Sequence, residues 1–228
     1  MKEEKDRLNH LVRNLERIST QNSIFNYKNG RKAFSSLDDG NIREWLDTFL
    51  PNTRMILEPK IIGSSIAIQY IDGRLKKAIN ENSKNITKSV MNLKNIPKSL
   101  PIKKRIEIQG VLYHNEMTSE NHIKTEIEGI LNFKPKYERL RFCAFKIYNC
   151  NINHFQSLQQ LKLLNFEIPQ TQFTNFISDI EIYHQYWKEG KLFKGYPTNG
   201  IVLKINSRKL QKYLEKNSKS INFEYTIN

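Results

Sequence analysis

Short runs of β-forming residues, separated by turns and helical stretches, constrain the fold of this chain more than any other feature. Residues 65–70 and 75–79 flank Asp72-Gly73, and an Asp-Gly pair between two alternating runs predicts a β-hairpin. Antiparallel hairpins with interspersed helices favour an α+β fold over a doubly wound parallel sheet. Similar runs predict further strands at residues 55–60, 105–113, 140–148 and 200–205.

Helical patterns occur before and between these strands. Apolar residues recur at helical spacing over residues 4–20, which predicts an amphipathic helix, and residues 21–33 contain turn formers typical of a linker. We therefore expect an N-terminal helix and linker over residues 1–32 and one domain over residues 33–228. Further helices are expected around residues 42–49, ended by Pro51, over residues 87–93, and twice between residues 148 and 200.

The charge of the chain favours a polyanionic partner. It has 228 residues, a formal net charge of +14 and a pI near 9.7, and each well-placed Lys or Arg gains free energy by releasing counterions from phosphates. The alternative is an AT-rich coding sequence that inflates Lys, Asn and Ile. The Lys-rich stretches 98–105 and 208–219 fit a nucleic-acid surface or simply a solvated face.

Other classes of protein are disfavoured. Long apolar segments and a hydrophobic signal sequence are absent, so we expect a soluble, cytoplasmic protein with no membrane partner. Cys143 and Cys150 have no ligand spacing, so we expect neither a zinc site nor a disulfide framework. We predict no metal-ligating residues. Four histidines likewise lack ligand spacing and are expected at the surface, namely His114, His122, His154 and His184.

One lysine lies in a short segment with an acidic residue and a glycine. Glu58-Pro59-Lys60 is followed by Gly63 directly before an apolar run. Taken alone, Lys60 at the end of a strand would be an exposed lysine, because lysines are seldom buried without a partner. Glu58 could pair with Lys60 or with Lys204 across a sheet. Seven further short segments carry motif-like residue patterns before and after this one. In chain order they are residues 33–40, 70–75, 96–100, 107–111, 141–145, 163–166 and 196–205.

Together these segments resemble the adenylation domain of NAD-dependent DNA ligases, from about Lys32 to the C-terminus. The resemblance implies the nucleotidyltransferase fold and a lysine amine that attacks the α-phosphate of NAD or ATP and passes AMP to a 5′-phosphate. It makes Lys60 the catalytic nucleophile, Glu58 the group facing the adenine edge and Lys204 the cation near the α-phosphate. The other nucleotide-binding residues that it implies are Gly63, Glu107, Lys124 and Lys191.

Departures from the family motifs weaken the expectation of catalysis. Ile62, Val111 and Asn199 stand where the family has acidic residues, and each such group typically contributes one or more kcal/mol to the transition state. The use of magnesium is therefore in question. A hairpin arginine of the family is replaced by Asn80, and Thr226 lies near the place of its last active-site lysine. Asn199-Gly200 is also a plain turn signal.

Three functions follow from this pattern. The first is a divergent and shortened ligase-like domain, without the family's other modules, that is impaired in self-adenylation and binds nucleic acid or a nucleotide, alone or as one subunit. The second is an active nucleotidyltransferase or split-ligase subunit, acting on nicked DNA or on RNA. The third is an interaction protein that holds a partner through its N-terminal helix.

Overall fold

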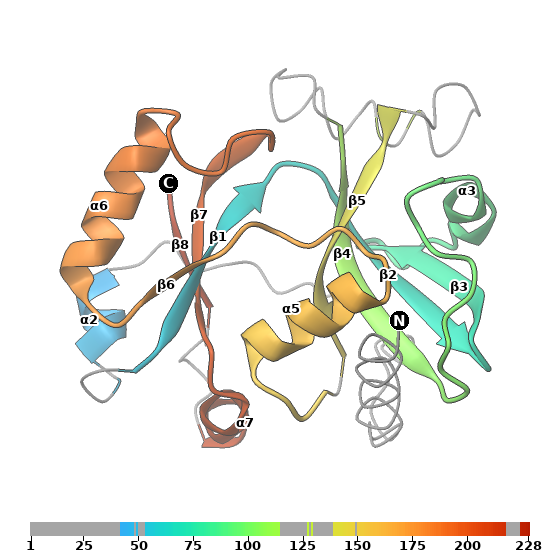
Figure 1. The fold of residues 1–228 in the computed structure, drawn as a ribbon, viewed down its shortest axis with the longest axis horizontal. Coiled ribbons are helices and arrows are strands. Elements are labelled where there is room, and N and C mark those ends of the chain that lie inside the picture. Colours follow the sequence, from blue (N-terminus) through green and yellow to red (C-terminus); the bar gives the residue numbers. More distant parts are fainter. Residues whose placement is uncertain are drawn as a thin grey trace, which may run out of the picture. The chain divides into compact units, whose positions relative to one another are not determined.

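The computed structural model describes residues 42–47, 49, 53–114, 127, 129, 139–148, 150–217 and 224–228. The described residues form two compact units. Unit 1 contains Gly63–Asn151 and Gln156–Ile168, and unit 2 contains Ser36–Ile62, Ile152–Phe155 and Pro169–Asn228. Each unit is built around its own four-stranded sheet (Figure 1). The predicted helix over residues 4–20, and with it the predicted boundary after residue 32, lies outside the described residues.

The sheet of unit 1 has the strand order β3-β2-β4-β5, and all its pairs are antiparallel. The predicted hairpin joins β2 to β3, and Asp72 and Gly73 both have positive φ angles, of 51° and 73°, as the tightest hairpin turn requires. The short helix α3 packs beside β3 (Figure 1). The bounds are β2 Ser64–Ile71, β3 Arg74–Asn80, α3 Thr87–Met91, β4 Ile106–Tyr113 and β5 Arg141–Ile147.

Unit 1 buries large aromatic side chains against this sheet. Tyr70, Tyr113 and Phe142 are fully buried. Phe166 follows helix α5 (His154–Leu163) and meets the rings of Tyr70 and Phe142 edge to face, with ring centroids 6.2 and 6.1 Å apart. Such pairs are more favourable than their buried area alone predicts. The segment that follows α5 is thereby anchored on the sheet of unit 1.

The sheet of unit 2 has the order β6-β1-β7-β8, also antiparallel throughout. One face packs against helices α2 and α6 through an apolar core that includes Trp45, Leu57, Ile180 and Leu203 (Figure 1). The bounds are α2 Ile42–Asp47, β1 Met55–Ile61, β6 Gln172–Thr174, α6 Ile177–Lys188, β7 Thr198–Ile205, α7 Arg208–Asn217 and β8 Glu224–Ile227.

Side chains alternate between the two faces along a strand, so the residues next to the core residues of β1 and β7 point the other way. Met55 and Leu57 belong to the core, which places Ile56, Glu58 and Lys60 on the opposite face. By the same alternation Lys204 lies on that face of β7. Unit 2 therefore has one apolar face and one face that bears charged residues.

The α+β class is confirmed, and every strand and helix predicted within the described residues is present. The sequence did not predict the short strands β6 and β8, nor that the Lys-rich stretch from residue 208 forms helix α7. Asn199-Gly200 does not form a separate turn, because both residues lie inside β7. None of the described helices is long and apolar enough to cross a membrane.

Candidate functional site

Lys60 lies at an irregularity in the pairing of β1 with β7. Pro59 pairs with Ile201 and Ile61 with Thr198, so Asn199 and Gly200 together oppose the single residue Lys60. This is a β-bulge on β7, a feature that locally redirects side chains. The Lys60 side chain is partly exposed, and its amine donates a hydrogen bond to Oδ1 of Asn228 at 2.8 Å.

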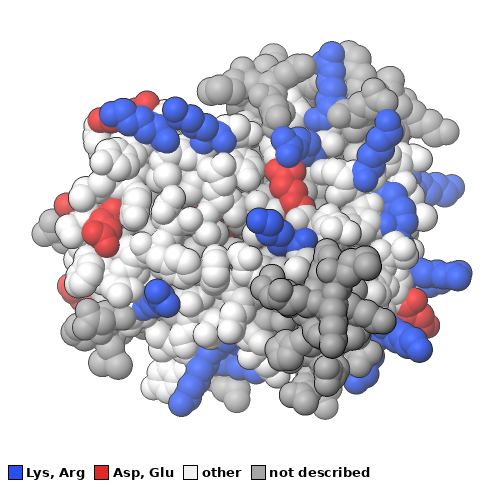
Figure 2. All heavy atoms as spheres, viewed as in Figure 1, with Lys and Arg blue, Asp and Glu red and all other residues white. Residues whose placement is uncertain are grey.

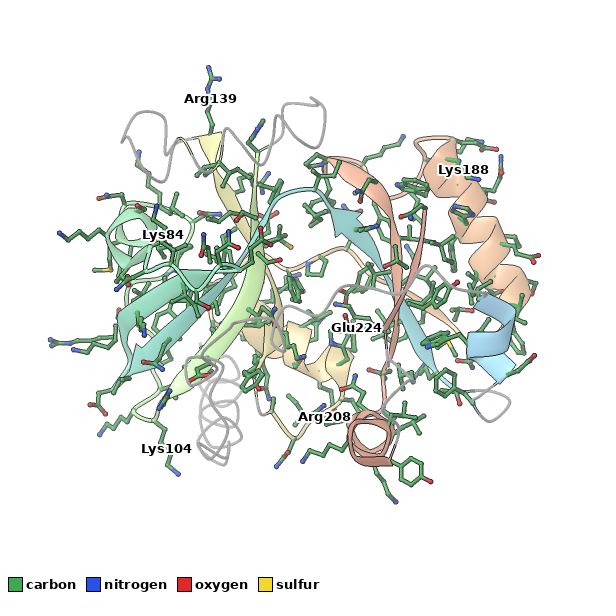
Figure 3. All side chains as sticks on the ribbon, turned by 180° about the vertical axis from the view of Figure 1, so that it is seen from behind. Lys84, Lys104, Arg139, Lys188, Arg208 and Glu224 are labelled. Carbon is green, nitrogen blue, oxygen red and sulfur yellow. The ribbon has the colours of Figure 1, made fainter. Side chains whose placement is uncertain are left out.

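The neighbouring carboxylate of Glu58 is engaged elsewhere on the same face. It is 2% exposed. Lys204 Nζ lies 2.9 Å from its Oε2, and His154 Nε2 lies 2.5 Å from its Oε1. Glu224, labelled on β8 in Figure 3, is a more distant partner of Lys204, at 4.0 Å. Of the two pairings considered for Glu58, the one with Lys204 is therefore present.

Lys204 and His154 together keep Glu58 ionised. Burial by itself raises the pKa of this carboxyl, but the charges of Lys204 and His154 and the hydrogen bonds from both outweigh burial and lower the pKa to about 2. A buried ion pair of this kind is costly to break, because the residue left behind has lost both its partner and its water. Glu58, Lys204 and His154, which we call the Glu58 cluster, therefore hold β1, β7 and the start of α5 together.

His154 is a site residue that the sequence analysis missed. Its expected surface position was wrong, since it is 8% exposed, and so was that of His114, which is 2% exposed. The absence of ligand spacing argues against a metal site but says nothing about burial. The backbone NH of His154 donates to the carbonyl oxygen of Asn206, which fixes the start of α5 in unit 2. No local sequence signal indicates this contact.

Gly63 and Glu107 lie in unit 1. A Cβ on Gly63 would come within 2.1 Å of the carbonyl oxygen of Leu112 and 2.7 Å of the Val111 side chain, so only glycine fits. The Glu107 carboxylate accepts a hydrogen bond from Gln69 at 3.1 Å and pairs with Arg105 at 2.7 Å. Both residues thus have structural roles within their unit, and their binding of a nucleotide stays a prediction.

Lys191 and Lys124 are the two remaining lysines predicted to bind the nucleotide. Lys191 follows α6, its side chain is 64% exposed, and its amine lies 2.6 Å from Glu189. The hydrogen bond to Glu189 raises the pKa of Lys191. Lys124 lies outside the described residues. Phosphate binding by either lysine stays a prediction.

The residues that replace family motif positions occupy ordinary structural environments. Ile62 donates its backbone NH to the carbonyl oxygen of Pro197 at 2.8 Å. The Asn80 amide oxygen accepts hydrogen bonds from the backbone NH groups of Asn82 and Lys84, which organises a turn. Thr226 is 2% exposed and its hydroxyl has no hydrogen-bond partner within the described residues.

The residues available for a metal ion are few. Within the described ranges, no three His, Cys, Asp or Glu side chains lie close enough to hold one. Glu58, the carboxylate nearest to Lys60 along β1, is already paired with Lys204 and His154. The described residues therefore do not fit a metal ion held by three or more such protein side chains.

Comparisons with known proteins give the fold class first. Solved structures of similar fold include a protein assigned as an ATP-dependent DNA ligase from Aquifex aeolicus, with a TM-score of 0.51 and 13% identity, covering 83% of this chain and 48% of that one. An archaeal ATP-dependent RNA ligase has a TM-score of 0.51 and 12% identity, covering 77% of this chain and 46% of that one. The fold is therefore the ligase-type nucleotidyltransferase fold.

Sequence relatives narrow the resemblance to DNA ligases. The DNA ligase of Mesoplasma florum is 28% identical over 190 residues, or 71% of this chain and 28% of that ligase. The DNA ligase of Mycoplasmopsis pulmonis is 28% identical over 218 residues, or 82% of this chain and 32% of that ligase. No family model matches. The expected resemblance to a ligase adenylation domain is confirmed, and this chain spans under a third of those relatives' length.

Proposed function

We propose that this chain is a DNA ligase-like nucleotidyltransferase domain that is impaired in forming AMP-lysine at Lys60 and that works chiefly by binding nucleic acid. The observation that carries the proposal is the surroundings of Lys60. Its amine donates to the neutral amide of Asn228, while Glu58 is held by Lys204 and His154. A lysine must lose a proton before it attacks phosphorus, and an amide oxygen is not a base at neutral pH.

Residue replacements support the same proposal. Ile62 and Val111 stand where the resemblance implies acidic groups that organise phosphate and metal, and neither side chain can replace a carboxylate. If each of these two lost groups costs one or more kcal/mol, their joint loss slows transfer by roughly thirtyfold or more. The retained lysines are consistent with a site that binds a phosphate without turning it over.

Intact-protein mass spectrometry tests the impairment. The protein is incubated with NAD or with ATP, each with Mg²⁺ or Mn²⁺. We expect well under one AMP per chain after an hour. The double variant Ile62→Asp with Val111→Glu restores both acidic groups and is expected to increase the adduct at least tenfold, whereas the matched variant Ile62→Asn with Val111→Gln is not. A stoichiometric adduct on Lys60 of the unaltered chain would refute the proposal.

The second candidate function is an active transferase, and it is favoured by the retention of Lys60 and Lys204 on one sheet face. A companion chain that supplies acidic groups is one form of this alternative, in which the chain is a split-ligase subunit joining nicked DNA or RNA. It predicts that Lys60→Ala abolishes transfer while leaving the thermal unfolding temperature unchanged. Dependence on NAD rather than ATP is decided by which nucleotide gives the adduct.

Nucleic-acid binding is supported by the charge of the chain. Its formal net charge is +14, and on the face drawn in Figure 2 the Lys and Arg side chains are more widespread than the acidic ones. Helix α7 is a specific candidate surface. Lys209 and Tyr213 are exposed one turn apart on this helix, which begins at Arg208 (Figure 3). Lysines neutralise phosphates, and an exposed aromatic ring can stack on a base.

Fluorescence anisotropy measures this binding with nicked duplex DNA and with RNA of the same sequence. The double variant Lys209→Glu with Lys212→Glu is expected to weaken affinity at least tenfold and to reduce the slope of log affinity against log salt concentration by about 1–2. Lys76→Glu with Lys84→Glu, on the other unit, is the charge-matched control. Equal losses in both double variants would argue against α7 as the contact surface.

A further inference from the structure

The amine of Lys60 and the side chain of Asn228 meet across a residue that has no side chain. Pro59 of β1 and Ile227 of β8 both pair with Ile201 of the central strand β7. One step further along the strands, Gly200 lies between Lys60 and Asn228. The Lys60 amine then reaches Asn228 Oδ1 at 2.8 Å. The hydrogen bond therefore passes over the central strand β7 at Gly200, a residue without a Cβ.

Gly200 is required for this arrangement on steric grounds. A Cβ at this position would lie 2.4 Å from the carbonyl oxygen of Ile227 and 2.9 Å from Asn228 Oδ1. Its φ angle of +155° is also one that other residues rarely adopt. The bulge at Asn199-Gly200 and the glycine within it thus leave room for two side chains from different strands to meet.

The backbone oxygen of Asn228 has its own partner, apart from the contact of its side chain with Lys60. The ring Nε2 of His184 on α6 lies 3.1 Å from the Asn228 backbone oxygen. That ring stacks on Trp187, with centroids 5.7 Å apart and planes within 7°. Trp187 in turn donates a hydrogen bond to the hydroxyl of Thr198 at 2.8 Å. A chain of contacts from α6 and β7 therefore fixes the end of β8.

We propose that Asn228 is a positioning residue for Lys60. Its amide oxygen accepts one amine N–H and holds the flexible four-carbon side chain over Gly200, without supplying a base or a counter-charge. This inference rests on the proposed function, because it concerns the same lysine that would take up AMP. A partly exposed hydrogen bond of this kind contributes about 1 kcal/mol, which corresponds to roughly fivefold in the population of the held conformation.

Pulse labelling with an N-hydroxysuccinimide acetate tests the proposal without any nucleotide. Acetylation of Lys60 is followed by mass spectrometry from pH 7 to pH 11 and normalised to exposed Lys76. Asn228→Ala is expected to speed labelling of Lys60 about fivefold. Asn228→Asp places a carboxylate beside the amine, so the pH midpoint of labelling is expected to rise by about one unit. An unchanged Lys60 rate in Asn228→Ala, or an unchanged midpoint in Asn228→Asp, would overturn the proposal.

A second pair of variants guards against effects of misfolding. Gly200→Ala pushes β8 away and is expected to speed labelling in the same direction as Asn228→Ala. Gly129→Ala, with no atom of the described residues within 4 Å of the added Cβ, should leave the rate unchanged. Because labelling needs no nucleotide, a failure here leaves the impairment of AMP transfer standing, and a stoichiometric AMP adduct leaves the positioning role standing.

Discussion

Two buried glutamates, one in each unit, are neutralised in different ways. Glu107 in unit 1 is 6% exposed and pairs with Arg105, two residues earlier, whose side chain is 31% exposed. Glu58 in unit 2 pairs with Lys204 and His154, both under 9% exposed and distant in the sequence. Unit 1 thus uses a local pair that reaches solvent, whereas unit 2 depends on a fully buried pair formed only by the fold.

The buried ion pair distinguishes the sheet face of unit 2 that carries Lys60, because stability alone does not explain why charged residues are buried there. Buried ionised groups seldom add stability compared with apolar residues of the same size, although removing one partner is strongly destabilising. A protein that required only stability at Glu58 could use an apolar residue there. A buried charged cluster beside Lys60 is the kind of feature that is common at functional sites.

Removing the buried cation should have the largest effect. Lys204→Met leaves the Glu58 carboxylate without its lysine, and we expect a loss of about 3–5 kcal/mol in the free energy of unfolding, measured by urea denaturation. The double variant Glu58→Gln with Lys204→Met should recover more than half of that loss, because no unpaired charge is then buried. A loss below about 1 kcal/mol in the single variant would mean that the Glu58 cluster is not desolvated as the structure indicates.

Acid should weaken unit 2 through Glu58. The pKa of Glu58 is lowered from 4.5 to about 2 in the folded chain, so its stabilisation is complete above pH 4.5 and is lost as the pH falls towards 2. The unfolding free energy of the unaltered chain should fall relative to that of Glu58→Gln by on the order of 3 kcal/mol between pH 6 and pH 2. Parallel pH curves for the two proteins would contradict this assignment.

At Gly63, where the chain passes from unit 2 into unit 1, we expect steric contact rather than charge to determine the loss of stability. Gly63→Ala places a Cβ 2.1 Å from the Leu112 carbonyl oxygen, so the backbone must move, at a cost of about 1–3 kcal/mol. Gly129→Ala, whose added Cβ meets no atom of the described residues within 4 Å, is the matched control and should change the free energy of unfolding by less than about 1 kcal/mol. Thermal and urea unfolding of both variants give the comparison.

The smallest effect is expected at the local pair of unit 1. Arg105→Ala removes the cation beside Glu107, but Arg105 is partly exposed and Gln69 still donates to the carboxylate. We expect a loss of about 1 kcal/mol, well below that of Lys204→Met. Similar losses in the two variants would remove the distinction between the units.

Local patterns were sufficient for most of the fold. The Asp72-Gly73 turn, the alternating strands and the helical repeats each depend on neighbours within a few residues, and the structure contains them at nearly the expected bounds. Lys60 was predicted as the candidate nucleophile because segments that resemble ligase motifs occur in order around it. The short strands β6 and β8 were missed, because three or four residues carry too little periodicity to distinguish a strand from a loop.

The amino-acid sequence by itself determined the α+β class, the positive charge and the residue types at the candidate site, including Ile62 and Val111 where the resemblance implies carboxylates. Only the tertiary structure decided which partners those residues have. His154 reaches Glu58 although 96 residues separate them, and Asn228 reaches Lys60 across 168 residues. Spacing along the chain predicts contacts within a helix or hairpin, but contacts between distant segments depend on how the strands pair and on where a glycine leaves room.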